Sequence, residues 1–480
     1  MHHPSRRAAL ARALALVAAA AVPRRARAVE PRMVPEPVPV SVEVAEDEAF
    51  ATVVARYDVR AVPAFAHSVH VDVDGLRPGR WYVYRFHAGQ ATSPVGRTRT
   101  ADAPDAAVDR LRFAIASCQH FEHGWYTAHR GLLAEDLDLM LFLGDYIYEG
   151  SWGDDPVRSY LGGEALTLAD YRVRHAQHKT DPALRALHAA VPWITTWDDH
   201  EVENDWAGDR SEYLDPGFLP RRAAAFQAYF EHLPFPRSRL PGIDGFRMHD
   251  TLTFGSLARF CVLDDRQHRD PQPCPGPSKG GGSTVVADAA CPSLGDPART
   301  MLGADQEAWV DRTLAASTQR WTILAQQTLV TPVDWNPEAG KHTWTDGWDG
   351  YPAARRRLLG TLKKRKVSNP VIVGGDVHAS YVSDVRLDPA DPRSAGIATE
   401  FCGTSITSQG STVEENEATI RDNPQFAFID GVHRGYVAFE LGPTTLTARV
   451  RGVDTKDPLA VPNTLATFTV ADGAPVVRRG

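Results

Sequence analysis

The sequence lacks the features of several classes of protein, and each absence excludes one of these classes. The chain has 480 residues, and no stretch after residue 28 is long and apolar enough to span a membrane. The chain has no internal repeat and no heptad pattern. It has no basic tract in its body and a formal net charge of −8, so stable nucleic-acid binding is not expected. Neither Ser405 nor Ser408 lies in a Gly-x-Ser-x-Gly elbow, so a serine hydrolase is not supported either.

The N-terminus has the composition of an export signal. Arg6-Arg7 precedes a weakly hydrophobic, alanine-rich stretch over residues 8–22, and Ala26-Arg27-Ala28 offers small residues at the spacing of a cleavage site. The arginine pair favours a twin-arginine signal over residues 1–28, with a signal for the general secretory route as the alternative. We therefore expect a linker over residues 29–39 and an exported protein, periplasmic or extracellular, whose partner during export is the twin-arginine translocase.

Five cysteines in a protein that is expected to be exported raise the question of disulfides. Cys274 and Cys291 flank a stretch rich in glycine and proline, which is a loop that a disulfide would stabilise. These two cysteines are predicted to pair. Cys261 lies in an apolar run and is expected to be a small buried hydrophobe.

Two regions of different secondary structure follow the linker. Short β-prone runs, including Ser68–Val73, fill residues 40–104 and predict a small β domain. Residues 105–475 alternate apolar strands with helical stretches and predict an α/β domain, with short strands returning over Gly435–Val470. The expected helices span Tyr126–Ala134, Leu168–Ala176, Pro182–Ala190, Arg221–Glu231, Gly303–Ala316 and Ala353–Lys364.

Four apolar runs in the α/β region end in residues that can bind metal ions. The carboxyl ends of strands are where ligands bind in open α/β sheets, so these residues are expected to converge. The runs are Phe113–Ala116 before Ser117-Cys118-Gln119, Leu139–Leu143 before Gly144-Asp145, Val191–Thr196 before Trp197-Asp198-Asp199-His200, and Val371–Val373 before Gly374-Gly375-Asp376-Val377-His378. An isolated aspartate after a strand is usually a cap, but four such ends in one domain favour a metal site.

The residue types at these ends suit the hydrolysis of phosphate esters with bridged metal ions. That chemistry needs carboxylates, imidazoles and amides around two or three cations that activate a water molecule. Asp145 suits the bridging position, and His378 and His200 supply imidazoles. The expected oxygen ligands of hard divalent ions are Asp199, Asp376 and Asn204.

Three of these residues narrow the chemistry further. Cys118 and Tyr148 are not ligands for magnesium or calcium, but a thiolate and a phenolate both suit ferric iron. The alternative is a buried structural cysteine and a stacking tyrosine. His200 is predicted to be the general acid that protonates the leaving alkoxide, with a role as ligand of a third metal as the alternative.

Together these motifs resemble the PhoD-like family of alkaline phosphatases and phosphodiesterases, within the calcineurin-like metallophosphatases. The resemblance extends over about residues 40–460. The matching stretches are Phe113–Gln119, Gly144–Glu149, Trp197–Asn204, Met301–Gln306 and Gly374–His378.

The resemblance implies a fold and a set of metals. It implies a four-layer αββα sandwich for the catalytic domain and a small immunoglobulin-like β-sandwich at the N-terminus. That β domain is expected to be truncated, because the edge strand with which family members usually begin is missing. The implied cofactors are Fe3+ and Ca2+, with other divalent ions as the alternative. Fe3+ would be held by Cys118, Tyr148 and Asp145 with His378 nearby, and Ca2+ would be shared among Asp145, Asp199, Asn204 and Asp376.

The expected function is that of a secreted, metal-dependent alkaline phosphatase. It would hydrolyse phosphomonoesters and phosphodiesters, small or polymeric, by attack of a metal-activated water, hydroxide or oxo ligand. One alternative is a phospholipase D-type diesterase acting on phospholipids. A further alternative is a non-catalytic protein of the cell wall that uses its β domain for binding.

Overall fold

The computed structural model describes residues 36–480 except 243–244, 278, 337–339, 390 and 392. The predicted signal over residues 1–28 and residues 29–35 of the predicted linker lie outside the described residues. The first strand, β1, begins at Val38, so it includes the last two residues of that linker.

Residues 38–99 form a five-stranded sheet in the order β2-β1-β3-β4, in which β5 also pairs with β3. The strands are β1 (Val38–Ala45), β2 (Val53–Ala61), β3 (Trp81–Ala88), β4 (Ala91–Thr92) and β5 (Gly96–Arg99). The two-sheet, immunoglobulin-like form of this region stays a prediction.

The expected strand at Ser68–Val73 is wrong, because this segment joins no sheet. Val69 and Val71 pack against the apolar residues of β1, so the alternation of the segment does reflect burial. Its polar side chains bond to the neighbouring domain: His70 Nδ1 lies 2.8 Å from the carbonyl oxygen of Phe235. The segment therefore covers a face of the sheet instead of extending its edge.

Two seven-stranded sheets form the rest of the molecule. The first has the order β21-β20-β19-β18-β6-β7-β8, and the second has the order β17-β15-β16-β14-β12-β10-β9. The strands of the first sheet are β6 (Leu111–Ala116), β7 (Leu139–Leu143), β8 (Trp193–Thr196), β18 (Arg434–Leu441), β19 (Thr445–Val453), β20 (Asn463–Ala471) and β21 (Ala474–Arg479). Those of the second are β9 (Asp250–Phe254), β10 (Ala258–Val262), β12 (Trp321–Ala325), β14 (Pro370–Gly374), β15 (Ser380–Arg386), β16 (Gly396–Cys402) and β17 (Phe426–Asp430). A separate ribbon pairs β11 (Val285–Ala287) with β13 (His342–Trp344).

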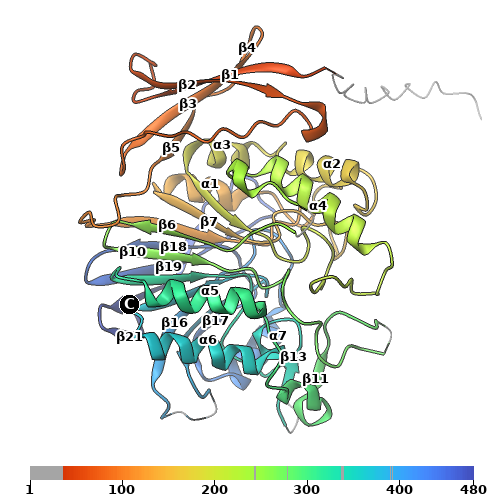
Figure 1. The fold of residues 1–480 in the computed structure, drawn as a ribbon. Coiled ribbons are helices and arrows are strands. Elements are labelled where there is room, and N and C mark those ends of the chain that lie inside the picture. Colours follow the sequence, from red (N-terminus) through yellow and green to blue (C-terminus); the bar gives the residue numbers. More distant parts are fainter. Residues whose placement is uncertain (1–35, 243–244, 278, 337–339, 390, 392) are drawn as a thin grey trace, which may run out of the picture.

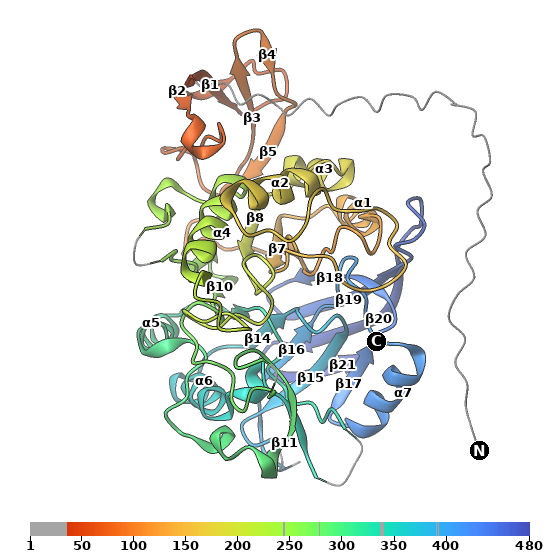
Figure 2. The same ribbon diagram turned by 90° about the vertical axis from the view of Figure 1, so that its right-hand side faces the viewer.

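Helices cover the outer faces of these sheets (Figures 1 and 2). The six predicted helices are present, with ends that differ by up to three residues. The helices are α1 (Thr127–Ala134), α2 (Leu168–His178), α3 (Pro182–Ala190), α4 (Phe218–His232), α5 (Gly303–Ala315), α6 (Pro352–Arg365) and α7 (Val413–Asp422). Helix α7 was not predicted, although Thr412 and Glu415 form a capping box at its start. No helix within the described residues is long and apolar enough to cross a membrane.

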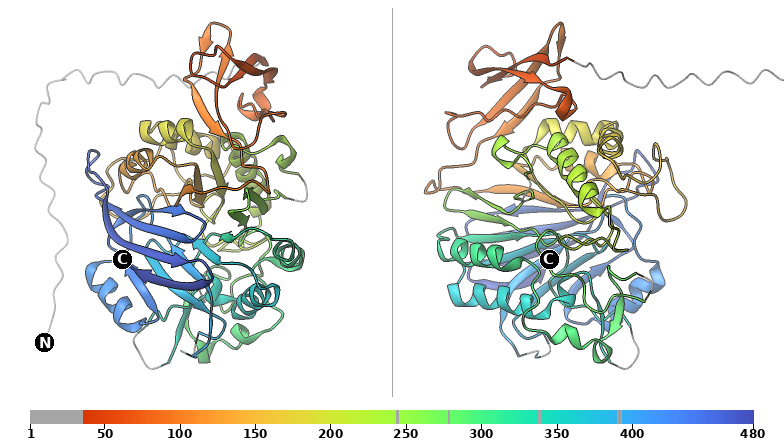
Figure 3. Two further views of the ribbon diagram at one scale, coloured as in Figure 1. Left: turned by 90° about the vertical axis from the view of Figure 1, so that its left-hand side faces the viewer. Right: turned by 45° about the vertical axis from the view of Figure 1, so that its right-hand side comes forward.

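The apolar strands are buried on both faces, which explains their unbroken hydrophobic runs. Phe113 and Ile115 of β6 belong to the core between the two sheets, whereas Ala114 and Ala116 face the helices α1–α4. In the inter-sheet core, the ring of Phe113 stacks on Phe439 with centroids 4.6 Å apart. Helices α5 and α6 pack on the outer face of the second sheet. The chain thus has a mixed α/β fold, and the N-terminal sheet sits over the layer of helices that contains α2–α4 (Figure 3).

Candidate metal centre

The predicted ligands follow strands whose carboxyl ends point to one edge of the molecule. β6, β7 and β8 are parallel neighbours in the first sheet, and β14 is one of the parallel strands β10, β12, β14 and β16 in the second. Because the two sheets pack face to face, the loops after these strands meet. Cys118 follows β6, Asp145 follows β7, Asp199 follows β8 and Asp376 follows β14.

The backbone at this edge is unusually strained. Cys118, Asp145, Asp376 and His378 have φ angles of 58°, 54°, 67° and 50°, in the left-handed region that residues with a Cβ rarely adopt. Such conformations persist only where the surrounding structure imposes them, and they concentrate at functional sites. Four strained residues among the predicted ligands therefore support a functional role for this edge.

Ligand atoms from the predicted residues approach closely enough to share cations. Each of three groups has its ligand atoms within 4.8 Å of one another, and Asp145 belongs to all three. The groups are Cys118 with Asp145 and His378, Asp145 with Asp199 and His200, and Asp145 with Asp198, Asp199 and Asp376. The shared position of Asp145 is the one expected of a bridging carboxylate.

The electrostatics of the cluster fit bound cations. Burial raises the pKa of Asp145 well above its ordinary value, and the nearby carboxylates of Asp199 and Glu201 add to the effect. Burial, followed by the charge of Asp198, raises the pKa of Asp376 in the same way. Asp145 Oδ1 and Asp376 Oδ2 are buried and have no hydrogen-bond partner. Crowded carboxylates with unpaired oxygens are costly unless a cation lies between them, so these residues suit metal ions.

Tyr148 and His378 extend the Cys118 side of the cluster. The phenolic hydroxyl of Tyr148 donates to Asp145 Oδ2 at 2.8 Å, accepts from Ser408 Oγ at 2.7 Å and lies 3.2 Å from His378 Nε2. His378 Nδ1 lies 2.8 Å from the carbonyl oxygen of Gln409. A proton on Nδ1 satisfies that bond, which leaves the lone pair of Nε2 to a metal.

His200 stands beside Asp145 and is held by a carboxylate that the sequence analysis did not single out. His200 Nδ1 lies 2.7 Å from Glu149 Oε2, and Glu149 Oε1 accepts from the backbone N–H of Asn204 at 2.8 Å. Burial opposes a charged imidazole, but Glu149, Asp199 and Asp145 outweigh burial and raise the pKa of His200 well above its ordinary value.

The cluster opens into a cavity of about 890 Å³. Asp145, Asp199, His200, Asp376 and His378 all line it, and Asn204 does as well. The side-chain amide of Asn204 donates to Glu212 Oε2 at 3.0 Å, so its nitrogen faces a carboxylate. The volume accommodates a small phosphate ester with its alcohol group.

Four further charged residues surround the cluster, and none of them was predicted as a ligand. Asp198 belongs to one of the ligand groups, and its neighbour Asp199 groups separately with Asp205 and Asp346. The guanidinium of Arg266 is buried between the two sheets, bonded to Asp198 and to Asp346. Its Nη2 also lies 3.7 Å from carboxylate oxygens of both Asp199 and Asp376. Arg266 lies in the loop that follows β10, which ends at Val262, and this position was a signal that it faces the same edge.

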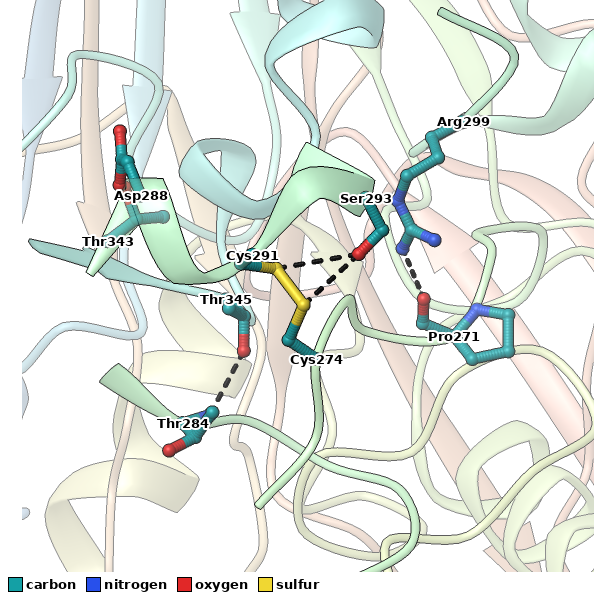
Figure 4. Close-up of a disulfide and its surroundings, with 9 residues drawn as sticks. All are labelled: Pro271, Cys274, Thr284, Asp288, Cys291, Ser293, Arg299, Thr343 and Thr345. Atoms are coloured by element: carbon teal, nitrogen blue, oxygen red, sulfur yellow. Dashed lines mark hydrogen bonds between the residues drawn. A yellow bond between two sulfur atoms is a disulfide. The ribbon is translucent and has the colours of Figure 1, made fainter. Parts of the chain in front are cut away.

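The predicted cysteine pair flanks a loop whose Val285 lines the metal-centre cavity. Cys274 and Cys291 form a disulfide with an S–S distance of 2.06 Å, and Ser293 lies beside it (Figure 4). Cys261 is buried in β10, and Cys118 and Cys402 are also free thiols. The loop of 274–291 is thus closed on itself.

Comparisons with known proteins match both regions of the chain. Residues 113–450 match the family model described as PhoD-like phosphatase, and residues 15–102 match the model of the PhoD-like phosphatase N-terminal domain. The chain belongs to the PhoD-like phosphatase family. The resemblance inferred from the motifs is therefore confirmed.

Individual relatives agree with this assignment. This PhoD-like phosphatase is 41% identical over 445 residues to a Bacillus subtilis (strain 168) protein named alkaline phosphatase D. The aligned region covers 90% of this chain and 74% of that protein. A solved structure described as the structure of PhoD matches with a TM-score of 0.88 at 40% identity, over 93% of this chain and 86% of that one. The chain is a phosphoric ester hydrolase, which decides against the alternative of a non-catalytic wall protein.

Proposed function

We propose that this PhoD-like phosphatase is an exported, metal-dependent alkaline phosphatase that hydrolyses phosphomonoesters and phosphodiesters. The observation that carries the proposal is the position of Asp145 in three overlapping ligand groups, with a buried oxygen that has no hydrogen-bond partner. The name of the Bacillus subtilis relative, alkaline phosphatase D, supports the same activity. Export through the twin-arginine translocase is proposed from the sequence of residues 1–28.

The donor set supports two kinds of metal ion. Fe3+ would be held by Cys118, Tyr148, Asp145 and His378, because thiolate and phenolate ligands suit a ferric ion. Ca2+ would be held by the oxygen ligands Asp145, Asp199, Asn204 and Asp376. When bound, such ions supply Lewis acidity for the phosphoryl oxygens and lower the pKa of water.

The chain's own residues would position and protonate the substrate. His200 lines the cavity beside Asp145, and its Nδ1 is occupied by Glu149, so its Nε2 is the atom that would give a proton to the leaving alcohol. Glu149 keeps this imidazole charged and fixes its orientation.

The finer description of the fold belongs to the same proposal. The arrangement of helices outside two face-to-face sheets supports a four-layer αββα sandwich of the metallophosphatase type. The five-stranded N-terminal sheet would be a reduced form of the immunoglobulin-like domain.

A chelation experiment tests the proposed function. The purified protein should hydrolyse a nitrophenyl phosphate monoester and the corresponding diester at alkaline pH. Exhaustive chelation should abolish both activities, and calcium with iron should restore them. Full turnover after complete removal of metals, verified by elemental analysis, would contradict the proposal.

A further inference from the structure

A second large cavity lies between the N-terminal sheet and the helices of the catalytic region. Its volume is about 790 Å³, close to that of the cavity at the metal centre. It is lined by β1, β3, β5 and residues 69–76 on one side, and by residues around α3, β8 and the end of α4 on the other. None of the residues that line it also lines the metal-centre cavity. The proposed phosphatase chemistry therefore does not account for it.

One side of this second cavity is apolar. Val42 and Val44 of β1, Phe86 of β3 and Val71 contribute aliphatic and aromatic surface. Trp193 faces the cavity from the catalytic region, where its ring stacks on His188 with centroids 3.9 Å apart. Such a wall suits the apolar body of a small molecule.

The cavity also carries three cations that are not matched by carboxylates. Arg97, Lys179 and Arg185 line it, and the described residues include no ion pair with any of them. The guanidinium of Arg97 lies over the ring of Trp81, 3.8 Å from its centroid. Lys179 Nζ donates only to the backbone oxygen of His232, and burial lowers its pKa to about 8.

Two carboxylates reach the same cavity, and they do not balance these cations. Glu231 is already engaged by Arg172 at 2.6 Å. Asp72 accepts from the neutral backbone N–H of Arg237 at 3.3 Å, so it keeps its charge and offsets only one of the three cations. The cavity is therefore positive in a chain whose net charge is −8, which favours an anionic occupant.

We propose that this cavity binds an amphipathic anion. The ligand would have one acidic head group, a carboxylate or a phosphate, held by Lys179 and Arg185. The apolar body of the ligand would lie against Val42 and Val44 of β1 and against Val71, with Trp193 on the opposite side. The site would be independent of the metal centre.

Calorimetric titration of the full-length, metal-loaded protein tests the proposal. The probe is sodium decanoate, because a carboxylate is not hydrolysed by a phosphatase. We expect saturable binding of one decanoate per chain. Decanol, which lacks the charge, and acetate, which lacks the apolar body, should each bind roughly tenfold more weakly or worse. Absence of saturable decanoate binding, or binding of decanol as tight as that of decanoate, would overturn the proposal.

Variants locate the binding. Lys179→Gln and Arg185→Gln should each weaken decanoate binding by roughly tenfold and leave phosphatase activity unchanged. Lys363→Gln on α6, in the opposite layer of helices, is the matched control and should bind as the wild type does. Asp145→Asn should lose phosphatase activity but keep decanoate binding. Binding that is lost in Asp145→Asn and unaffected in both cavity variants would place decanoate at the metals and refute the second site.

Discussion

Replacing His200 with alanine tests the proton-donor role most sharply. In the structure, Glu149 Oε2 lies 2.7 Å from Nδ1 of His200, and the imidazole contacts the ring of Tyr148 in a tilted arrangement with centroids 4.1 Å apart. The imidazole is thus fixed at the cavity wall with one nitrogen free for the substrate. His200→Ala removes this proposed proton donor while all the proposed metal ligands remain.

The expected loss depends on the leaving group. General acid catalysis contributes about 10²- to 10⁴-fold to a rate, which corresponds to roughly 3–5 kcal/mol of transition-state free energy. An alkyl phosphate ester, whose alkoxide is a poor leaving group, should lose all of this factor in His200→Ala. A nitrophenyl ester needs little protonation and should lose less than about tenfold. Glu149→Gln removes one charge-assisted hydrogen bond, so its effect on the alkyl ester should be smaller, about 10- to 100-fold.

The assay compares kcat/KM for both esters in each variant at one alkaline pH, together with metal content. His433→Ala is the matched control, because the His433 side chain also pairs with a carboxylate, Asp430 at 2.9 Å, but is exposed and does not line the metal-centre cavity. It should leave both rates unchanged. Equal losses on the two esters in His200→Ala, accompanied by loss of metal, would refute the proton-donor role and indicate a metal ligand.

Three further predictions concern stability and the strand ends. Cys274 and Cys291 should appear as a linked peptide pair in mass spectrometry, and replacing both with serine should lower the free energy of unfolding by about 3 kcal/mol, because the disulfide closes a short loop; two free thiols would contradict this. Burial lowers the pKa of His129 from its ordinary 6.5 to about 4. Between these two pH values the imidazole is protonated in the unfolded chain and neutral in the folded chain. Urea unfolding should therefore show stability falling from pH 6.5 to 4 by about 1.4 kcal/mol per pH unit from this residue, and His129→Gln should show a shallower fall; identical slopes would be inconsistent with a neutral buried imidazole. Gly144→Ala should abolish activity, since its Cβ would lie 2.4 Å from Cβ of Asp198 at a φ of +104°; an active, stable variant would show that this turn tolerates a side chain.

The metal-centre residues were accessible to sequence reasoning because each follows a local signal. An apolar run such as Leu139–Leu143 marks a doubly buried strand, and the polar residue after it marks the strand end. The parallel arrangement of β6, β7 and β8 then brings these ends together without further information. The same local reasoning found six helices from their periodicity.

Other features of the site and the fold could not be predicted from the local sequence, because they depend on contacts between segments that are far apart in the chain. Arg266 acquires its place from aspartates on other segments, such as Asp198 and Asp346, and the strand end that precedes it does not encode these partners. Glu149 was visible in a motif, but its bond to His200 depends on the approach of two separate loops. Helix α7 has no buried side chain, and the signal that could have revealed it was the capping box of Thr412 and Glu415 at its start. The segment 68–73 has the alternation of a strand but covers a sheet face, a distinction that alternation alone does not make.

The visible absorption spectrum of the purified enzyme, with its iron content, tests the central claim most directly. A ferric ion bound by the phenolate of Tyr148 and the thiolate of Cys118 absorbs visible light, whereas zinc, calcium or magnesium at the same place would be colourless. We predict a coloured protein that contains iron, a band that shifts or disappears in Tyr148→Phe, and weaker iron retention in Cys118→Ser. Tyr436→Phe, which alters a buried tyrosine bonded to Glu135, should keep the wild-type spectrum. A fully active enzyme with no visible band and no iron would contradict the account, and Cys118 and Tyr148 would then be packing residues.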